Sequence, residues 1–461
     1  MDDPPKFQFN EIRFLARTFL GILLTSFTLA TPLGALEVNK GAIPLLHVKD
    51  GSGQTITMAT GFVVKPEGVL LTNYHILIGA HAVDAIFPDG ATFSVKNVYK
   101  VDRIKDFAVL QLDGKNFSTI PLGNSATLRP FDYTSALGYP YEKMRFETTH
   151  TPDPIIQTFG MVLGTHPRTQ PDFSILYTTA PLSPGFSGGP LVDKDNLVIA
   201  LGMVEGRSIN LALPINHVKA FLNATAGFSF AELRKQDESS VATLYYQGSF
   251  ELYEKSNPEA ALDIFKKVLD KNPKSVSALY DSAVAYRNLG RAEEAIKTYE
   301  KALQVFPHFP AALSNLGGQY FRSGKLEKAV ESFQKAVADF PNFIEALSNL
   351  GATLNKLERY GEALPYLEKT ARLKPEFAMA QFNLGNTYYG LKRYPAAKTA
   401  FKRAANLGLN FVSLHWKLFK IHQFKGRNEL AARELEYILE IDPENDEARF
   451  ELSMPNFRNL E

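Results

Sequence analysis

The chain has 461 residues, which suggests two or three domains, and 45% of them are hydrophobic, which excludes a disordered protein. Its formal net charge is +1 and it has no long run of Lys or Arg, so we expect no nucleic-acid partner. The absence of cysteine excludes disulfides and thiolate metal sites, and it is compatible with an oxidising compartment. No HExxH-like spacing of metal ligands occurs, and we expect neither a metal ion nor another cofactor.

The N-terminal residues 1–36 have the pattern of an export signal. Lys6, Arg13 and Arg17 precede an uncharged, largely apolar run from Thr18 to Leu36. A basic flank before a short apolar run is typical of a secretory signal peptide. An uncleaved membrane anchor is the main alternative, because the run approaches the ~20 residues of a membrane-spanning helix, and an N-terminal core helix is the other. We therefore expect an exported protein, periplasmic or secreted, that is tethered to a membrane if the leader is not cleaved.

Residues 37–228 have the pattern of an all-β domain. Short apolar and β-branched runs, such as TITMATGFVV, GVLLTNYHIL and LVIALGMVEG, are separated by Gly, Pro, Asn and Asp. Strands with this spacing are typical of a β-sandwich or barrel. About 190 residues is a suitable length for two small β-barrels packed together.

Ser187 lies in the glycine-rich stretch SPGFSGGPLVD, which is either an ordinary turn or a loop that carries a nucleophile. Glycines at 185, 188 and 189 permit a backbone path that side chains would block. In such a loop the N–H groups of Gly185 and Ser187 could converge on one carbonyl oxygen and stabilise an oxyanion. The sequence therefore makes Ser187 a candidate nucleophile and Gly185 and Ser187 a candidate oxyanion hole.

A serine nucleophile needs a base, and the base needs an orienting group. His75 ends the apolar run LLTNYHIL and is the candidate base, whereas a structural histidine is the alternative reading. Asp106 begins the apolar run DFAVLQL, where its carboxylate can be partly buried against the imidazole. Asp102 is the rival, but its basic neighbours Arg103 and Lys105 suggest a solvated residue. The predicted catalytic set is His75, Asp106 and Ser187.

The stretches TGFVV, GVLLTNYHIL, DFAVLQL and PGFSGGPLV resemble trypsin-like serine proteases, most closely the HtrA type. The resemblance implies two six-stranded β-barrels with the active site between them, and it covers about 190 residues. Two positions depart from the usual pattern, because Phe186 replaces a polar residue before the serine and Tyr74 precedes the histidine. The resemblance implies a specificity pocket between Pro181–Pro184, Met203–Val204 and Leu211–Ala212, with Met203, Val204, Leu211 and Ala212 as substrate-binding residues. Because Pro181 carries no charge where a pocket for basic residues would have an acid, we expect a preference for small or medium apolar substrate residues.

The C-terminal half repeats with a period of 34 residues. Proline falls on this lattice at Pro273, Pro307, Pro341, Pro375 and Pro443, and small residues precede each step by twelve positions. Helix pairs closed by proline and packed through small residues must stack into a solenoid to bury their apolar faces. The pattern resembles the tetratricopeptide repeat, with six repeats over 242–445, a capping helix and tail over 446–461, and a polar linker over 229–241. The resemblance implies a concave surface that binds peptides or partner proteins.

Asparagine stands at the same place on the first helix of three successive repeats, at Asn315, Asn349 and Asn383. An amide offers both a donor and an acceptor, so a row of amides could bind the backbone of an extended peptide. The alternative is that these residues serve only helix packing or solubility.

Together these features predict a multidomain protein: an all-β, trypsin-like double barrel followed by an all-α repeat solenoid. The predicted function is that of an exported serine endopeptidase whose repeat arm binds protein substrates or a partner protein. The alternative from another class is a catalytically silent scaffold or chaperone that acts through its repeats.

Overall fold

The computed structural model describes residues 38–140, 154–167, 173–205, 209–224, 226–409 and 411–458. The expected signal peptide or anchor, residues 1–36, lies outside these described residues. Among the helices that the structure describes, none combines the length and the apolar character needed to span a membrane. Residues Asn39–Glu461 form one unit by their internal contacts, and this unit contains all the helices and strands described below.

The first part of the unit is an antiparallel sheet of seven strands with the order β2-β1-β5-β6-β7-β4-β3. Apolar side chains that alternate along these strands meet in one core, which includes Leu46, Val83 and Leu110. The strands are β1 (Leu45–Lys49), β2 (Thr55–Thr60), β3 (Phe62–Lys65), β4 (Val69–Thr72), β5 (Ala82–Ile86), β6 (Thr92–Asp102) and β7 (Phe107–Leu112).

The second part is a closed six-stranded barrel with the order β10-β13-β12-β11-β8-β9. Its strands are β8 (Tyr133–Gly138), β9 (Ile156–Pro167), β10 (Ser174–Thr178), β11 (Pro190–Val192), β12 (Val198–Glu205) and β13 (Ile209–Pro214). The all-β prediction is therefore confirmed. The resemblance implied six strands in each barrel, whereas the first sheet has seven strands in an order that does not close.

The segment 229–241, which we expected to be a linker, contains a packed helix instead. Helix α2 (Phe230–Glu238) begins with a capping box formed by Ser229 and Glu232. Phe230 and Leu233 are buried in the core of the first sheet. The polar composition of this segment reflects the solvent-facing side of the helix, and its two buried apolar residues were too few to be recognised as a helix face.

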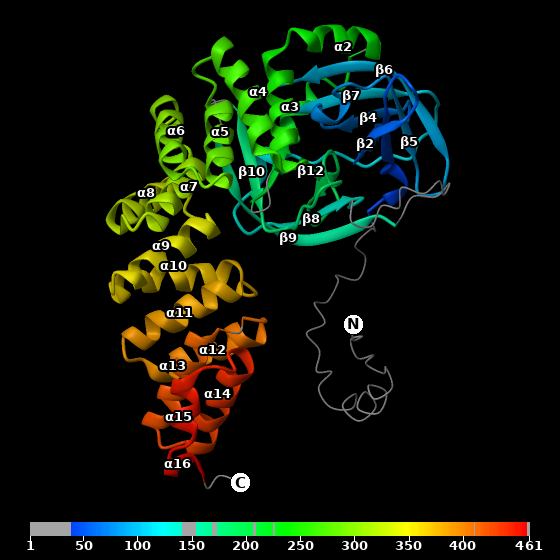
Figure 1. Cartoon of the computed structure of the whole chain (residues 1–461). Helices are drawn as coiled ribbons and strands as arrows, with labels where there is room; N and C mark the ends of the chain where they lie inside the picture. The colour runs from blue at the N-terminus through cyan, green and yellow to red at the C-terminus, as the bar shows by residue number, and fades with distance from the viewer. Residues whose placement is uncertain are drawn as a thin grey trace, which may run out of the picture. The chain divides into compact units, whose positions relative to one another are not determined.

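Twelve helices, α3 to α14, pack as six consecutive pairs that follow one another along the chain (Figure 1). Their pairing confirms the repeat solenoid, and small residues explain its period: a Cβ on Gly317 would lie 2.8 Å from the ring of Phe333 in the paired helix. The helices are α3 (Val241–Tyr253), α4 (Pro258–Lys271), α5 (Val276–Asn288), α6 (Ala292–Val305), α7 (Pro310–Arg322), α8 (Leu326–Asp339), α9 (Ile344–Lys356), α10 (Tyr360–Leu373), α11 (Ala378–Gly390), α12 (Tyr394–Asn406), α13 (Val412–Phe424) and α14 (Asn428–Ile441), followed by α15 (Asp446–Leu452) and α16 (Pro455–Arg458).

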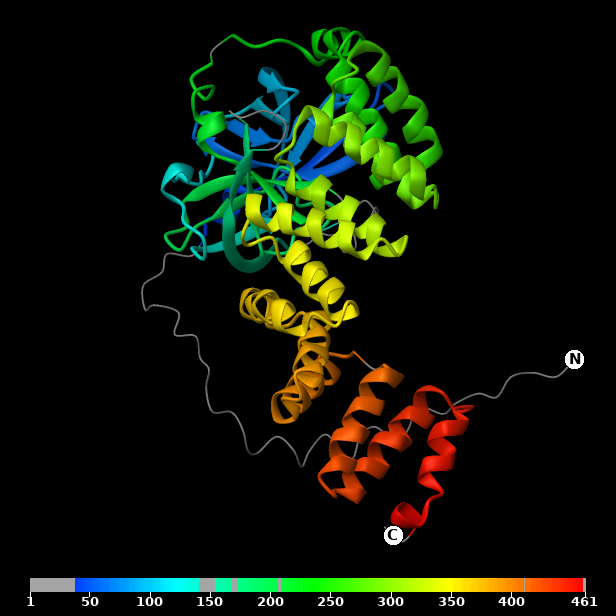
Figure 2. The ribbon, with the colours of Figure 1, turned by 90° about the vertical axis from the view of Figure 1, so that its left-hand side faces the viewer.

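The repeats contact the barrel as well as the sheet. Between α8 and α9, the ring of Phe340 lies 4.6 Å from that of Tyr177 on β10, and Phe343 lies 6.3 Å from the same ring. The Asn342 side chain donates a hydrogen bond of 3.1 Å to the carbonyl of Leu163 on β9. Figure 2 shows these yellow-green helices against the strands of the barrel. The repeat array is therefore docked on the all-β part at more than its first helix.

Candidate active site

The loop that carries Ser187 connects β10 to β11 and is fastened to strand β2 of the other sheet. The Thr60 hydroxyl donates a hydrogen bond of 2.7 Å to the carbonyl of Gly185, and the Thr60 N–H donates one of 3.0 Å to the carbonyl of Ser187. Gly188 has φ +82°, and a Cβ there would collide with the Thr72 hydroxyl and the Thr60 carbonyl. Glycine is required because the loop adopts a left-handed conformation and touches the neighbouring strand directly.

The backbone of this loop leaves two N–H groups available. Phe186 and Gly188 donate their N–H groups to backbone carbonyls. Within the part of the chain that the structure describes, the N–H groups of Gly185 and Ser187 donate to no backbone carbonyl. Phe186, the unusual residue before the serine, is buried in the core of the second barrel. The Phe186 side chain therefore anchors the loop in the barrel core, and the N–H groups on either side of it remain without a backbone acceptor in the described part of the chain.

His75 and Asp106 form a close pair where the neighbouring strands β4 and β7 of the first sheet end and begin, respectively. The Asp106 carboxylate accepts from His75 Nδ1 at 2.7 Å and from the His75 backbone N–H at 2.9 Å. Asp106 is 2% exposed, and its carbonyl accepts 2.9 Å from the Asn73 amide. It has φ +58°, a left-handed conformation that Asp tolerates better than most residues. The rival Asp102 instead accepts from the N–H groups of Ile104 and Lys105 in its own turn.

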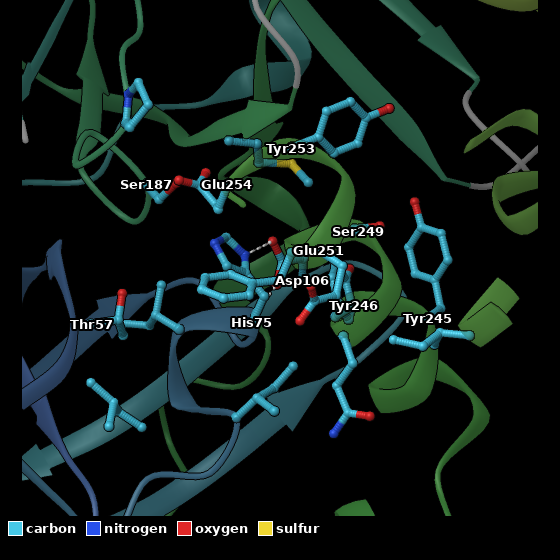
Figure 3. Close-up of a pocket in the computed structure, with 18 of the residues that line it drawn as sticks. Thr57, His75, Asp106, Ser187, Tyr245, Tyr246, Ser249, Glu251, Tyr253 and Glu254 are labelled. Carbon is cyan, nitrogen blue, oxygen red and sulfur yellow. Dashed lines mark hydrogen bonds and ion pairs between the residues drawn. The ribbon is translucent and has the colours of Figure 1, made fainter. Parts of the chain in front are cut away.

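His75, Asp106 and Ser187 line one cavity of about 450 Å³, so the structure brings the three predicted residues together. The His75 ring lies between Asp106 and the side of the cavity that holds Ser187 (Figure 3). Ser187 is 8% exposed and lines the cavity. This arrangement has the components that nucleophilic attack by a serine requires.

The first repeat helix, α3, forms the opposite wall of this cavity. The ring of Tyr246 is stacked on the His75 imidazole, with 6.0 Å between the centroids and 26° between the planes (Figure 3). Glu254, the residue that caps the end of α3 through a backbone hydrogen bond to Phe250, also lines the cavity. Desolvation raises the pKa of Glu254, and the nearby His75 opposes that rise. The catalytic set thus faces the repeat array as well as the two sheets.

A buried polar network connects α2 and α3 to the residue before the histidine. The Tyr74 hydroxyl bonds to Asp237 at 2.8 Å and to the Thr243 hydroxyl at 2.7 Å. Arg103 donates to the same carboxylate of Asp237 at 2.6 Å and forms an ion pair with it. Burial and the hydrogen bond to Asp237 raise the pKa of Tyr74 far above its usual value, so this phenol stays protonated. Tyr74, the second departure from the family pattern, is the residue that α2 and α3 hold.

Asp281 on α5 fixes the other end of α3. This residue is 3% exposed and accepts 2.7 Å from the Tyr245 hydroxyl, 2.6 Å from the Tyr253 hydroxyl and 3.2 Å from the Ser249 hydroxyl. Burial, together with the negative charge of Asp281, raises the pKa of Tyr253 well above its usual value. Three side chains that line the cavity are therefore held by the second repeat.

The predicted walls of the specificity pocket lie at different places. Met203 lines the cavity beside Ser187. Leu211 pairs with Met203 across β12 and β13 and is 7% exposed, whereas Ala212 is buried in the barrel core. Val204 lies on β12 next to these residues, and its side chain is outside the described ones. Met203 is thus the predicted wall residue that reaches the catalytic set.

The three asparagines of the repeats have different surroundings. Asn315 donates 2.8 Å to the Tyr280 hydroxyl, Asn383 is buried with 8% exposure, and Asn349 is exposed. Peptide binding by these residues stays a prediction. The residues that sequence reasoning missed are Tyr246 and Glu254. Their helix has the ordinary pattern of a first repeat, and no local signal indicates that it faces a catalytic cleft.

Comparison with known proteins assigns each half separately. Residues 59–201 match the trypsin-like peptidase domain family, and residues 246–308, 280–342 and 350–408 match the tetratricopeptide repeat. The mitochondrial serine protease HTRA2 of Drosophila virilis is 36% identical over 187 residues, and that of Drosophila erecta has the same identity. The match covers 39% of this chain and 43% of each relative, so the chain spans less than half the length of these relatives. A solved structure of the HtrA-type protease AlgW with a tripeptide is 25% identical, with a TM-score of 0.35, over 41% of this chain and 60% of that one.

Proposed function

We propose that this chain, in which an HtrA-type trypsin-like peptidase domain is followed by tetratricopeptide repeats, is an exported serine endopeptidase. The single observation that carries the proposal is the shared cavity of Ser187, His75 and the buried Asp106, with the His75–Asp106 hydrogen bond of 2.7 Å. A carboxylate on Nδ1 holds the imidazole in the tautomer whose other nitrogen can accept a proton.

In the proposed mechanism, His75 removes the proton from the Ser187 hydroxyl as its oxygen attacks the substrate carbonyl. Asp106 stabilises the imidazolium that forms and is not itself protonated. His75 then gives its proton to the leaving amine, which frees the first product and leaves an acyl-enzyme on Ser187. Water, deprotonated by His75, releases the second product by the same steps in reverse order.

The N–H groups of Gly185 and Ser187 would bind the oxyanion of each tetrahedral intermediate. Their proposed role is supported by the absence of backbone acceptors for these two groups in the described part of the chain. Donors that are already oriented towards the developing charge need no rearrangement during the reaction. This is why a fixed loop, fastened through Thr60, suits the chemistry.

The proposed substrates are proteins or peptides, as the similarity to peptidases suggests. The proposed role of the repeats is to bind a substrate or a partner protein. Met203 and the apolar strand residues around it favour a small or medium apolar residue before the cleaved bond. Export to the periplasm or outside the cell remains the proposal for residues 1–36.

A serine-reactive fluorophosphonate tests the proposed function directly. We expect the full chain to be labelled and the Ser187→Ala variant to remain unlabelled, with the His75→Ala variant labelled far more slowly. Absence of labelling and of peptide cleavage in the wild-type chain would favour the silent scaffold or chaperone instead.

A further inference from the structure

The catalytic histidine proposed above is packed between two halves of the chain that the sequence presents as separate domains. Asp106 lies on one edge of its ring, and the Tyr246 ring from the first repeat lies on its face. We infer that Tyr246 is a positioning residue for His75, so that the first repeat is part of the active site and not only an arm for binding. This inference rests on the proposed function.

The stacking geometry supports a direct effect on the imidazole. A centroid distance of 6.0 Å and an interplanar angle of 26° lie within the range of offset-stacked rings. When His75 gains a proton during catalysis, its positive charge lies near the electron-rich face of the tyrosine ring. Such a cation–π contact stabilises the charged form more than the neutral form. Tyr246 therefore favours the imidazolium and restricts rotation of the ring.

The position of Tyr246 is fixed from both ends of α3. At the start of the helix, the Thr243 hydroxyl bonds to Tyr74, the neighbour of His75 in the chain, at 2.7 Å. The Tyr246 ring also meets the Tyr74 ring edge to face at 5.9 Å. At the far end, Asp281 holds Tyr253 through a hydrogen bond of 2.6 Å. A helix that only approached the cleft by chance would not be joined to the histidine's own turn by a buried hydrogen bond.

Asp106, in the turn before β7, and Glu254, at the end of α3, face His75, and Glu251 on α3, paired with Lys255 at 2.7 Å, lines the same cavity. All three carboxylates are retained when Tyr246 is replaced, so a change in the protonation of His75 reports the loss of the ring alone. Without the Tyr246 ring the imidazolium of His75 is less stable, so the acid limb of the pH–rate profile moves to lower pH.

The test uses the full chain with Tyr246→Leu and Tyr246→Met, which remove the ring with different losses of volume, and Tyr246→Phe, which keeps it. We expect the two ring-deleting variants to lose about tenfold in kcat/KM, mostly in kcat, and to shift the acid limb down by about half a pH unit to one unit. Tyr246→Phe should behave as the wild type. The matched control is Tyr437→Leu, which removes a tyrosine tilted against His415 in the last repeat, with 5.2 Å between the ring centroids and 36° between the planes.

A second readout does not need activity. We expect the proton between His75 Nδ1 and Asp106 to give a far-downfield NMR signal, whose titration should show the same downward shift in the ring-deleting variants. Unchanged titration and unchanged acid limb in Tyr246→Leu and Tyr246→Met would overturn the inference. So would an equal shift in Tyr437→Leu. An inactive wild-type chain whose His75 still titrates as described would instead contradict the proposed function and leave the positioning role standing.

Discussion

Three histidine–carboxylate pairs with Nδ1–oxygen distances of 2.7–2.8 Å occur among the described residues, and two of them, one in the cleft of Ser187 and one in the last repeat, also lie near a tyrosine ring. His75 Nδ1 lies 2.7 Å from Asp106, and His415 Nδ1 lies 2.8 Å from Glu434. The Tyr246 ring is stacked on His75, and the Tyr437 ring lies tilted against His415. The His75 side chain is 29% exposed and opens into a cavity, whereas that of His415 is 5% exposed within the helix pair. A histidine–carboxylate pair alone is therefore not evidence of catalysis. Whether it can act as a base depends on its accessibility to substrate and on the group that faces the second ring nitrogen of the histidine.

Removing the Ser187 hydroxyl, the group that faces His75 in the cleft, is expected to have the largest effect. Ser187→Ala should lower kcat by about 10⁶-fold while leaving the fold intact, because the cleft pair then resembles the repeat pair in having no nucleophile. Cleavage of a chromogenic peptide measures the loss, and thermal unfolding controls for the fold. Adding His75→Ala should cost almost nothing further, since the groups act as a unit. Substantial cleavage by Ser187→Ala would exclude the proposed mechanism.

Neutralising the carboxylate of each pair should separate chemistry from stability. Asp106→Asn should reduce kcat by about 10⁴-fold, because the amide favours the wrong tautomer of His75. Glu434→Gln should leave kcat unchanged and destabilise the last repeat by about 1–3 kcal/mol, because a buried hydrogen-bond partner is altered. Peptide cleavage and hydrogen exchange of α13 and α14 measure the two effects. A fall in kcat for Glu434→Gln would show that the repeat pair is not independent of the cleft.

The repeat pair should also respond to acid in its own way, through its neighbour His422. This residue is 1% exposed, and desolvation, aided by Lys398 and other cations, lowers its pKa below 6.5. His422 binds a proton in the unfolded repeat but not in the folded one. The free energy of unfolding is therefore highest above about pH 6.5 and falls at lower pH, by at most about 1.4 kcal/mol per pH unit.

Hydrogen exchange of α13 and α14 at about pH 7.5 and about pH 5.5 checks this sign. His422→Phe, which fills the site with an uncharged ring, should flatten the dependence. Equal protection at both values in the wild-type chain would show that His422 does not report the folding of the repeat.

The smallest expected effect belongs to Glu254, the carboxylate that distinguishes the cleft from the repeat pair. The electrostatic attraction between Glu254 and His75 is mutual, so the Glu254 charge stabilises the imidazolium. Glu254→Gln should move the acid limb of kcat/KM to lower pH by a few tenths of a unit, about the size of a partly solvated charge pair. High salt should reduce the difference between the variant and the wild type. A shift to higher pH would contradict the assigned sign.

The sequence was sufficient for the predictions that rest on local chemistry. Ser187 was indicated by glycines that the loop requires for steric reasons, and the repeats by a period that helix packing imposes. The contacts across domains could not be predicted, because their residues serve two purposes. Tyr246 occupies an ordinary position of a first repeat helix, and its contact with His75 depends on how α3 is docked. The same holds for the segment 229–241, whose helix is defined by only two buried apolar residues, Phe230 and Leu233.

The shared wall of the cavity bears on how the proposed peptidase activity could be inhibited selectively. The match to trypsin-like peptidases ends at residue 201, whereas the wall opposite Ser187 comes from α3. A compound that reacts with Ser187 and extends towards Phe250 and Tyr253 would contact side chains outside the region shared with those peptidases. Its affinity for this chain would then depend on side chains that an inhibitor confined to the surroundings of the serine does not contact. Such a compound could discriminate between this chain and trypsin-like peptidases with a similar reactive serine.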